Sequence, residues 1–210
     1  MRISILFIFL FSSAFFQAQI DSINLIHPAA ITAVTSDERA PFTHSDFDAE
    51  DLNKRDAAQD LPFLLRFAPS VVVTSDAGNG IGYTGMRIRG TDASRVNVTI
   101  NGVPLNDAES QGVYWVNLPD LGASVSGLQI QRGVGTSTVG AGAFGASVAV
   151  NTLGAIVKPG VRAVLGMGSF NSSRESVSWN TGMIGNGFSF DGRASHVSSD
   201  GYIDRASSEL

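Results

Sequence analysis

Residues 96–107 read Val-Asn-Val-Thr-Ile-Asn-Gly-Val-Pro-Leu-Asn-Asp. In the first half of this stretch, β-branched apolar residues alternate with Asn97 and Thr99, which is the two-residue period of a half-buried β-strand. Asn101 and Gly102 follow at once, and both residue types accept the positive φ angles of a two-residue hairpin turn. The stretch therefore predicts a β-hairpin and favours a β-rich fold around it.

Strand-like patterns continue on both sides of this hairpin. Residues 128–131 and 148–151 alternate between apolar and polar types, and residues 71–74 are mostly β-branched. A glycine-dense loop follows over 76–85. We expect residues 70–152 to form a small mixed β-sheet.

One segment is convincingly helical. Asp48 or Ser45 can cap a first short turn, and Asp60 followed by Pro62 is typical of a second helix start. We expect a helix over 60–68 that packs on the sheet. Its apolar stripe, at helical spacing, comprises Leu61, Leu64, Leu65 and Ala68.

Beyond Gly160 the pattern changes to longer amphipathic segments. We expect residues 160–200 to form three antiparallel strands that turn near 170 and near 186. Alternation of this kind is typical of an outer-membrane barrel, and it also suits an amphipathic sheet in a soluble sandwich. The apolar face should carry Val161, Leu165, Val177, Trp179, Phe188 and Phe190.

The N-terminus predicts export. Arg2 precedes a short apolar run, and a small residue stands at Ala18, so residues 1–18 are expected to be a cleaved secretory signal. The run is shorter than the roughly 20 residues that a membrane-spanning helix needs. Residues 19–47 lack lasting periodicity and are expected to be an extended lead-in.

Composition and motifs exclude several classes of function. The chain has no cysteine and a net charge of −5, which argues against thiolate metal sites and a nucleic-acid surface. Two glycine motifs, 80–85 and 140–145, match the dinucleotide fingerprint, but strand-like residues follow both where a helix would be needed. We therefore expect turns there and no cofactor. No catalytic residues and no metal ligands are recognisable, so we expect no enzyme.

The remaining motifs stand in a fixed order. They are Met-Arg-Ile-Arg-Gly at 86–90, the stretch 98–107, Leu-Gln-Ile-Gln-Arg-Gly at 128–133, the second glycine motif, and Val-Ala-Val-Asn at 148–151. This series resembles the plug domain of TonB-dependent receptors. The resemblance implies an α+β plug domain, a small mixed sheet with short helices, over 48–155. It also implies that residues 160–210 are antiparallel strands of an incomplete transmembrane β-barrel. Because such receptors close a barrel of ~22 strands, we expect this chain to be an N-terminal fragment.

The resemblance also implies residue roles. A segment in the lead-in resembles the TonB box, which pairs as an added strand with the periplasmic energy transducer; it comprises Ala30, Ile31, Thr32, Ala33, Val34 and Thr35. Arg89 and Arg132 match plug arginines that pair with barrel-wall carboxylates, so in this chain they should be exposed or held by local carbonyls. The residues expected to face the ligand are Asn79, Tyr83, Asn106, Asp107, Tyr114 and Trp115.

The function implied is energy-coupled uptake of a scarce ligand at the cell outer membrane. An iron chelate, such as a siderophore or haem, is the commonest ligand of the family, and vitamin B12 or a glycan are alternatives. The partners implied are TonB, outer-membrane lipid and the small ligand, with no nucleic acid. Two other functions remain open: a secreted plug-like binding module without transport, and a periplasmic nucleotide-dependent enzyme. The second would require a helix after Gly85 or Gly145.

Overall fold

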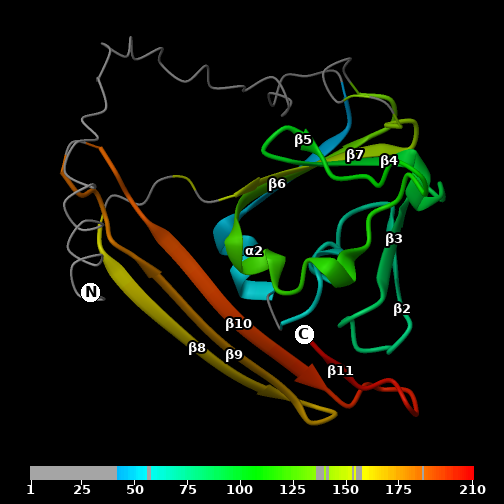
Figure 1. Cartoon of the computed structure of the whole chain (residues 1–210). Coiled ribbons are helices and arrows are strands. Elements are labelled where there is room, and N and C mark those ends of the chain that lie inside the picture. The colour runs from blue at the N-terminus through cyan, green and yellow to red at the C-terminus, as the bar shows by residue number, and fades with distance from the viewer. Residues whose placement is uncertain are drawn as a thin grey trace, which may run out of the picture. The chain divides into compact units, whose positions relative to one another are not determined.

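The computed structural model describes residues 42–55, 58–135, 140, 142–152, 154, 158–185 and 187–210 (Figure 1). The expected signal peptide and TonB box lie outside the described residues. Within the described part, the strands belong to a five-stranded, a four-stranded and a two-stranded sheet. No helix among these residues is both long and apolar enough to cross a membrane.

The five-stranded sheet is mixed, as the sequence predicted. Its strands, in spatial order, are β1 (His44–Asp48), β6 (Val125–Arg132), β7 (Ala146–Thr152), β4 (Val96–Ile100) and β5 (Val103–Pro104). β4 and β7 run parallel, and the other pairs are antiparallel. Asn101 and Gly102 form the turn between β4 and β5 with φ angles of 50° and 83°, which confirms the hairpin.

The sheet begins earlier in the chain than the sequence suggested. Residues 44–47 were expected in the lead-in, but they form most of β1, where Phe47 pairs with Leu128. A five-residue strand with a single large apolar side chain is too short to show a period. Asp48, and not Ser45, caps the helix α2 (Ala49–Arg55), because its Oδ1 accepts a hydrogen bond from the amide of Asp51 at 2.7 Å.

The second helix, α3 (Leu61–Leu64), is shorter than the expected 60–68. After Leu64 the chain continues in tight turns, in which the amides of Arg66 and Ala68 donate to carbonyls three residues back. Pro69 disfavours α-helical geometry at Ala68 and so prevents the turns from continuing as a helix. The expected apolar stripe is nevertheless buried and belongs to the hydrophobic core: Leu61, Leu64, Leu65 and Ala68.

Short elements complete this part of the fold. β2 (Val71–Ser75) and β3 (Thr84–Ile88) form an antiparallel pair. This pair is a separate two-stranded sheet, so the expectation that residues 70–152 form one mixed sheet is wrong for residues 71–88. Three 3-10 helices span Ala93–Arg95, Trp115–Asn117 and Leu121–Ser124; we call the last two η4 and η5. Both faces of β4 are covered, because Asn97 and Thr99 are as buried as the neighbouring valines. The alternation in β4 therefore separates an apolar core from a buried polar layer, and not from solvent.

The C-terminal strands form a separate antiparallel meander (Figure 1). Its strands are β8 (Gly160–Gly168), β9 (Ser172–Asn180), β10 (Asp191–Ser199) and the short β11 (Ser208–Glu209), which pairs with β10. The first turn lies at Phe170 and Asn171, and the second contains a bridge between Ile184 and Phe188. The expected turns near 170 and 186 are confirmed, whereas β11 was not expected.

Alternate side chains of the meander lie on opposite faces. One face is open and mostly apolar, with Leu165 and Met167 81% and 96% exposed. It also carries the exposed Glu175 and His196, which the register places beside Leu165. The other face buries polar residues such as Arg174 and Ser176. All six expected apolar residues are exposed, and none joins the core of the mixed sheet. Phe188 and Phe190, however, lie in the connection before β10, which begins only at Asp191.

The fold class expected from the sequence is therefore confirmed. A small mixed sheet with short helices is followed by antiparallel strands, which form an open sheet within the described residues.

Candidate functional site

Two of the six expected ligand-facing residues share one cavity. A hollow of about 250 Å³ lies in the loop between β5 and η5. Asp107 and Tyr114 both line it, and Tyr114 is 54% exposed. A carboxylate and a phenol at the rim of an otherwise apolar hollow offer a hydrogen-bond acceptor and an aromatic surface to a small molecule.

Asn106 holds this loop in place. Its Oδ1 accepts a hydrogen bond from the amide of Val98 at 2.8 Å, and its Nδ2 donates to the carbonyls of Val96 and Gln111 at 2.9 and 2.8 Å. The side-chain amide of Asn106 thus takes the place of a backbone partner for β4. These hydrogen bonds hold the loop on the strand.

Asp107 organises the next turn. Its Oδ1 accepts hydrogen bonds from the amides of Glu109 and Ser110 at 3.1 and 2.7 Å and from the Ser110 hydroxyl at 2.9 Å. These hydrogen bonds, led by the one from the Ser110 amide, lower the pKa of Asp107. The carboxylate therefore stays charged at the rim of the cavity.

Trp115 does not lie where the sequence analysis placed it. It is 4% exposed and belongs to the hydrophobic core. It begins η4, whose tight geometry turns the side chain inward while the preceding Tyr114 remains at the surface. Trp115 is therefore a core residue, contrary to our expectation that it faces a ligand.

The other expected ligand-facing loop, 76–85, carries Asn79 and Tyr83. Tyr83 is exposed. Asn79 is tied to the meander, because its Nδ2 donates to the Ser199 hydroxyl at 2.7 Å, and its Oδ1 accepts from the amide of Ile81 at 3.1 Å. The amide of Tyr202 also donates to the carbonyl of Ala77 at 2.9 Å. This loop is fixed to the end of β10.

The glycine motifs pack closely and do not open helices. Gly85 lies within β3, and Gly145 directly precedes β7. A Cβ at Gly80 would lie 2.5 Å from Cδ1 of Phe63, and one at Gly145 would collide with Thr91. The nucleotide-dependent enzyme, which required a helix after either motif, is therefore contradicted.

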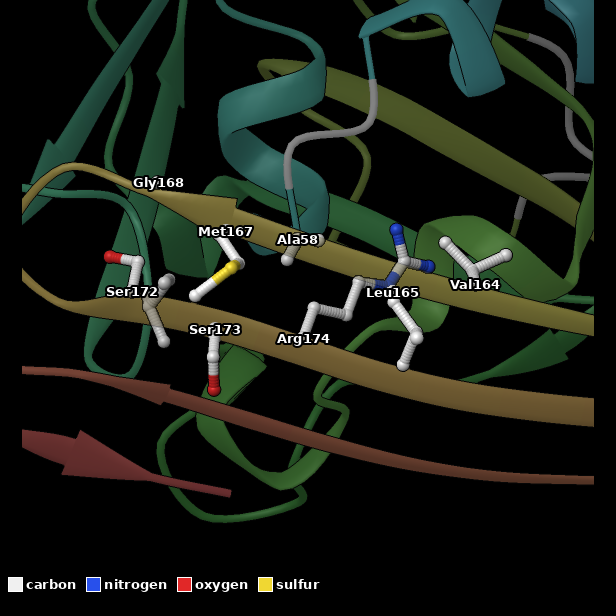
Figure 2. A pocket seen from close by; sticks show the side chains of 10 residues that line it. Ala58, Val164, Leu165, Met167, Gly168, Ser172, Ser173 and Arg174 are labelled. Carbon is white, nitrogen blue, oxygen red and sulfur yellow. The ribbon is translucent and has the colours of Figure 1, made fainter.

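A larger cavity, of about 330 Å³, lies beside β8 and β9 (Figure 2). Most of its wall comes from residues 164–168 and 172–174 of these strands, and Ala58 and Ile81 complete it. Gly166 and Gly168 carry no side chain that would fill it. Arg174 is the charged residue of its lining.

The two expected lock arginines lie near each other. Arg89 is exposed, and its Nη1 lies 3.0 Å from the position of a Cβ on Gly133, next to Arg132. Arg132 donates to the Ser45 hydroxyl at 2.7 Å and to the His44 carbonyl at 3.2 Å. Within the described part of the chain, no carboxylate lies within 4.0 Å of either guanidinium. Arg132 is thus held by strand β1, and Arg89 by no described side chain.

A charged cluster that the sequence analysis missed joins η5 to the meander. Asp120 precedes η5, and its side chain is 1% exposed. Nη2 of Arg174 on β9 forms an ion pair with one carboxylate oxygen at 2.6 Å, and Arg193 of β10 donates from Nη1 to the other at 2.5 Å. The same Nη1 also donates to the backbone carbonyl of Asp120 at 2.8 Å.

The sequence pattern bears on the two arginines of this cluster but not on its carboxylate. Arg174 and Arg193 lie at positions that alternate with apolar residues of their strands, and this alternation could have placed them opposite the apolar face. Nothing local to Asp120 indicates that it meets them, since Arg193 is 73 residues away. No group of three or more histidines and carboxylates in the described residues could hold a metal ion.

Comparisons with known proteins agree on the family. The TonB-dependent Receptor Plug Domain matches residues 36–147. No curated protein matches the chain.

Among solved structures, the chain is similar to the siderophore receptor PirA from Acinetobacter baumannii, with 21% identity and a TM-score of 0.54 over 75% of this chain and 24% of that one. It is also similar to a variant of the ferric enterobactin receptor PfeA from Pseudomonas aeruginosa, with 24% identity and a TM-score of 0.58 over 77% and 25%. For the copper transporter OprC the identity is 18% and the TM-score 0.61 over 84% and 27%.

These likenesses show the fold, and the chain spans about a quarter of the length of each of these structures. The plug match, in contrast, covers more than half of the chain. The chain belongs to the TonB-dependent receptors and contains their plug domain.

Proposed function

We propose that the chain is the N-terminal part of an outer-membrane receptor that takes up an iron chelate with energy supplied through TonB. The observation that carries this proposal is the plug-domain match over residues 36–147. The similar structures include one named as a siderophore receptor and one named as a ferric enterobactin receptor.

The faces of the meander support a membrane location. Lipid-facing residues of an outer-membrane barrel are apolar and alternate with polar residues that face the lumen. β8 and β9 have this arrangement, with Leu165 and Val177 on the open face and Arg174 and Ser176 on the covered face. Export by the expected signal peptide, residues 1–18, is the route to this membrane.

The plug loops provide the ligand contacts in this proposal. Tyr83, Asp107 and Tyr114 remain at the surface, and the last two line the 250 Å³ cavity. Ligand bound there biases release of the TonB box, residues 30–35, into the periplasm. The first described strand after the box is β1, an edge strand paired only with β6 among the described strands. Traction on the box therefore reaches the β1–β6 pairing first.

Uptake measurements test the proposal. Cells that express the gene should accumulate a radiolabelled ferric siderophore under iron limitation, and cells without the gene or without TonB should not. A protein found in the culture medium and not in the outer-membrane fraction would favour the secreted binding module. Uptake of copper, vitamin B12 or a glycan in place of the iron chelate would keep the receptor and replace the ligand.

A further inference from the structure

We propose that Asp120, Arg174 and Arg193 form a plug-to-wall lock that fixes the 105–124 loop of the plug to the first barrel strands. The proposal rests on the proposed function only for the identity of β8–β10 as barrel wall. The contact itself is an ion-pair cluster in which the plug supplies the carboxylate and the meander supplies the arginines. In the pairs expected for Arg89 and Arg132, the plug instead supplies the arginine.

The cluster engages both sides of one carboxylate. Arg174 and Arg193 come from neighbouring strands and each binds a different oxygen of Asp120, at 2.6 and 2.5 Å. The side chains of Asp120 and Arg174 are 1% and 9% exposed. Charge pairs that are removed from water in this way hold firmly only while every partner is present, because a lone buried charge is costly.

Asp120 is also fixed from the plug side. Its backbone adopts the left-handed conformation, with φ 54° and ψ 26°, directly before η5. Two residues later, Gly122 lies so close to Leu64 that an added Cβ would be 2.5 Å from its Cδ1. The backbone that carries the carboxylate is therefore closely packed against the core on the plug side.

The lock separates two cavities along the wall. Arg174 and Val164 line both the 330 Å³ cavity and a smaller one of about 120 Å³. The smaller cavity is also lined by Arg162, Arg193, Ser176 and Ser178.

The lock has a defined polarity. The plug supplies a carboxylate at Asp120, and β9 and β10 supply the arginines. Arg89 and Arg132 carry the opposite charge to Asp120, so they would repel Arg174 and Arg193. The cluster therefore favours Asp120, and not the plug arginines, against β9 and β10.

Hydrogen exchange of the 210-residue chain in detergent micelles tests the lock. Asp120→Asn should speed amide exchange in residues 112–124, 172–178 and 191–197 by about tenfold or more, because it removes the counter-charge of the buried Arg174 and the partly buried Arg193. Glu109→Gln is the matched control, since it removes an exposed carboxylate from the same loop. It should leave exchange in these segments unchanged.

A triple variant separates a lock from a merely structural contact. Asp120→Asn combined with Arg174→Gln and Arg193→Gln removes the unpaired charges, so it should exchange more slowly than Asp120→Asn alone. The proposal is overturned if Asp120→Asn behaves like the control, or if the triple variant exchanges as fast as the single one. Folding of the triple variant when Asp120→Asn fails to fold supports the lock, and failure of both overturns it. Loss of uptake activity has no bearing on these outcomes, so the lock and the proposed function are tested separately.

Discussion

Asp60 is a carboxyl group that folding removes from water. It is 2% exposed, and its Oδ2 accepts a hydrogen bond from the Thr84 hydroxyl at 2.7 Å. Burial disfavours the charged form more than hydrogen bonds from Thr84 and the Gly82 amide favour it, which raises the pKa of Asp60 from 3.8 to about 6. The folded protein therefore binds the Asp60 proton more tightly than the unfolded chain.

This difference predicts a pH-dependent stability. The contribution of the Asp60 proton is complete below pH 3.8 and is lost as the pH rises through about 6. Asp60→Asn keeps an acceptor for Thr84 and cannot ionise. The free energy of unfolding of the native protein relative to this variant should therefore fall by up to roughly 3 kcal/mol between pH 4 and pH 7. Urea unfolding at the two pH values measures it, and a constant difference between the two proteins would contradict the raised pKa.

Residue types were easier to predict than residue environments. The sequence indicated that Asn106 and Trp115 lie in loops of the plug; Asn106 does, whereas Trp115 begins the 3-10 helix η4. It did not reveal that Asn106 completes the hydrogen bonding of β4 or that Trp115 enters the core, because each depends on contacts with distant chain segments. Asp120 was missed for the same reason.

At the scale of elements, local chemistry predicted the hairpins best. Asn101 and Gly102 determine a turn by their own φ angles, and the strand β4 before them has enough residues to show a period. β1 and β11 were not predicted, because a short strand is defined by the partner that it pairs with. The helix expected over 60–68 ends before Pro69, but α3 already ends at Leu64, where the chain continues in tight turns.

The open face of β8 leads to a prediction about membrane insertion. Leu165 lies near the middle of this strand and is 81% exposed. If lipid covers this face, Leu165→Lys should destabilise insertion into lipid vesicles by about 2–4 kcal/mol, because a lysine at mid-membrane depth loses its hydration. The measurement is the fraction folded in vesicles as a function of urea concentration.

Val72→Lys is the control for this experiment. Val72 is also exposed, but it lies on β2, outside the meander. The substitution should leave insertion unchanged. Equal effects of the two lysines would mean that the open face of β8 does not contact lipid.

At the scale of the whole molecule, the proposed function has energy enter through the segment before β1. Ile31 lies in the TonB-box segment expected to pair with TonB as an added strand. In a receptor that carries this chain and a complete barrel, Ile31→Pro should abolish uptake and leave ligand binding at the cell surface intact. Proline removes an amide donor and disfavours pairing with the partner strand. Ile31→Val, which keeps both properties, should retain uptake.

Binding and uptake assays on the same cells decide this prediction. Loss of surface binding together with uptake would point to a folding defect. Undiminished uptake by the proline variant would place the TonB contact elsewhere in the lead-in.

Arg89 and Arg132 require partners that the described part of this chain does not supply. Nη1 of Arg89 lies 3.0 Å from the position of a Cβ on Gly133, and among the described residues Arg132 donates to the Ser45 hydroxyl and the His44 carbonyl. Once a closed barrel excludes water around them, such charges need carboxylates, and the planar guanidinium fork suits bidentate pairing. We therefore expect the complementary carboxylates on barrel strands beyond β11.

The consequence is measurable as leakage. In the complete receptor, Arg89→Ala or Arg132→Ala should loosen the plug and increase the entry of small antibiotics several-fold, because each removes one partner of a desolvated charge pair and leaves the other uncompensated. Arg87→Ala is the matched control, since Arg87 is an exposed arginine two residues away on β3. It should leave antibiotic sensitivity unchanged. Equal sensitivity of the three variants would assign the plug's retention to Asp120 and the mixed sheet, and would remove the lock role from Arg89 and Arg132.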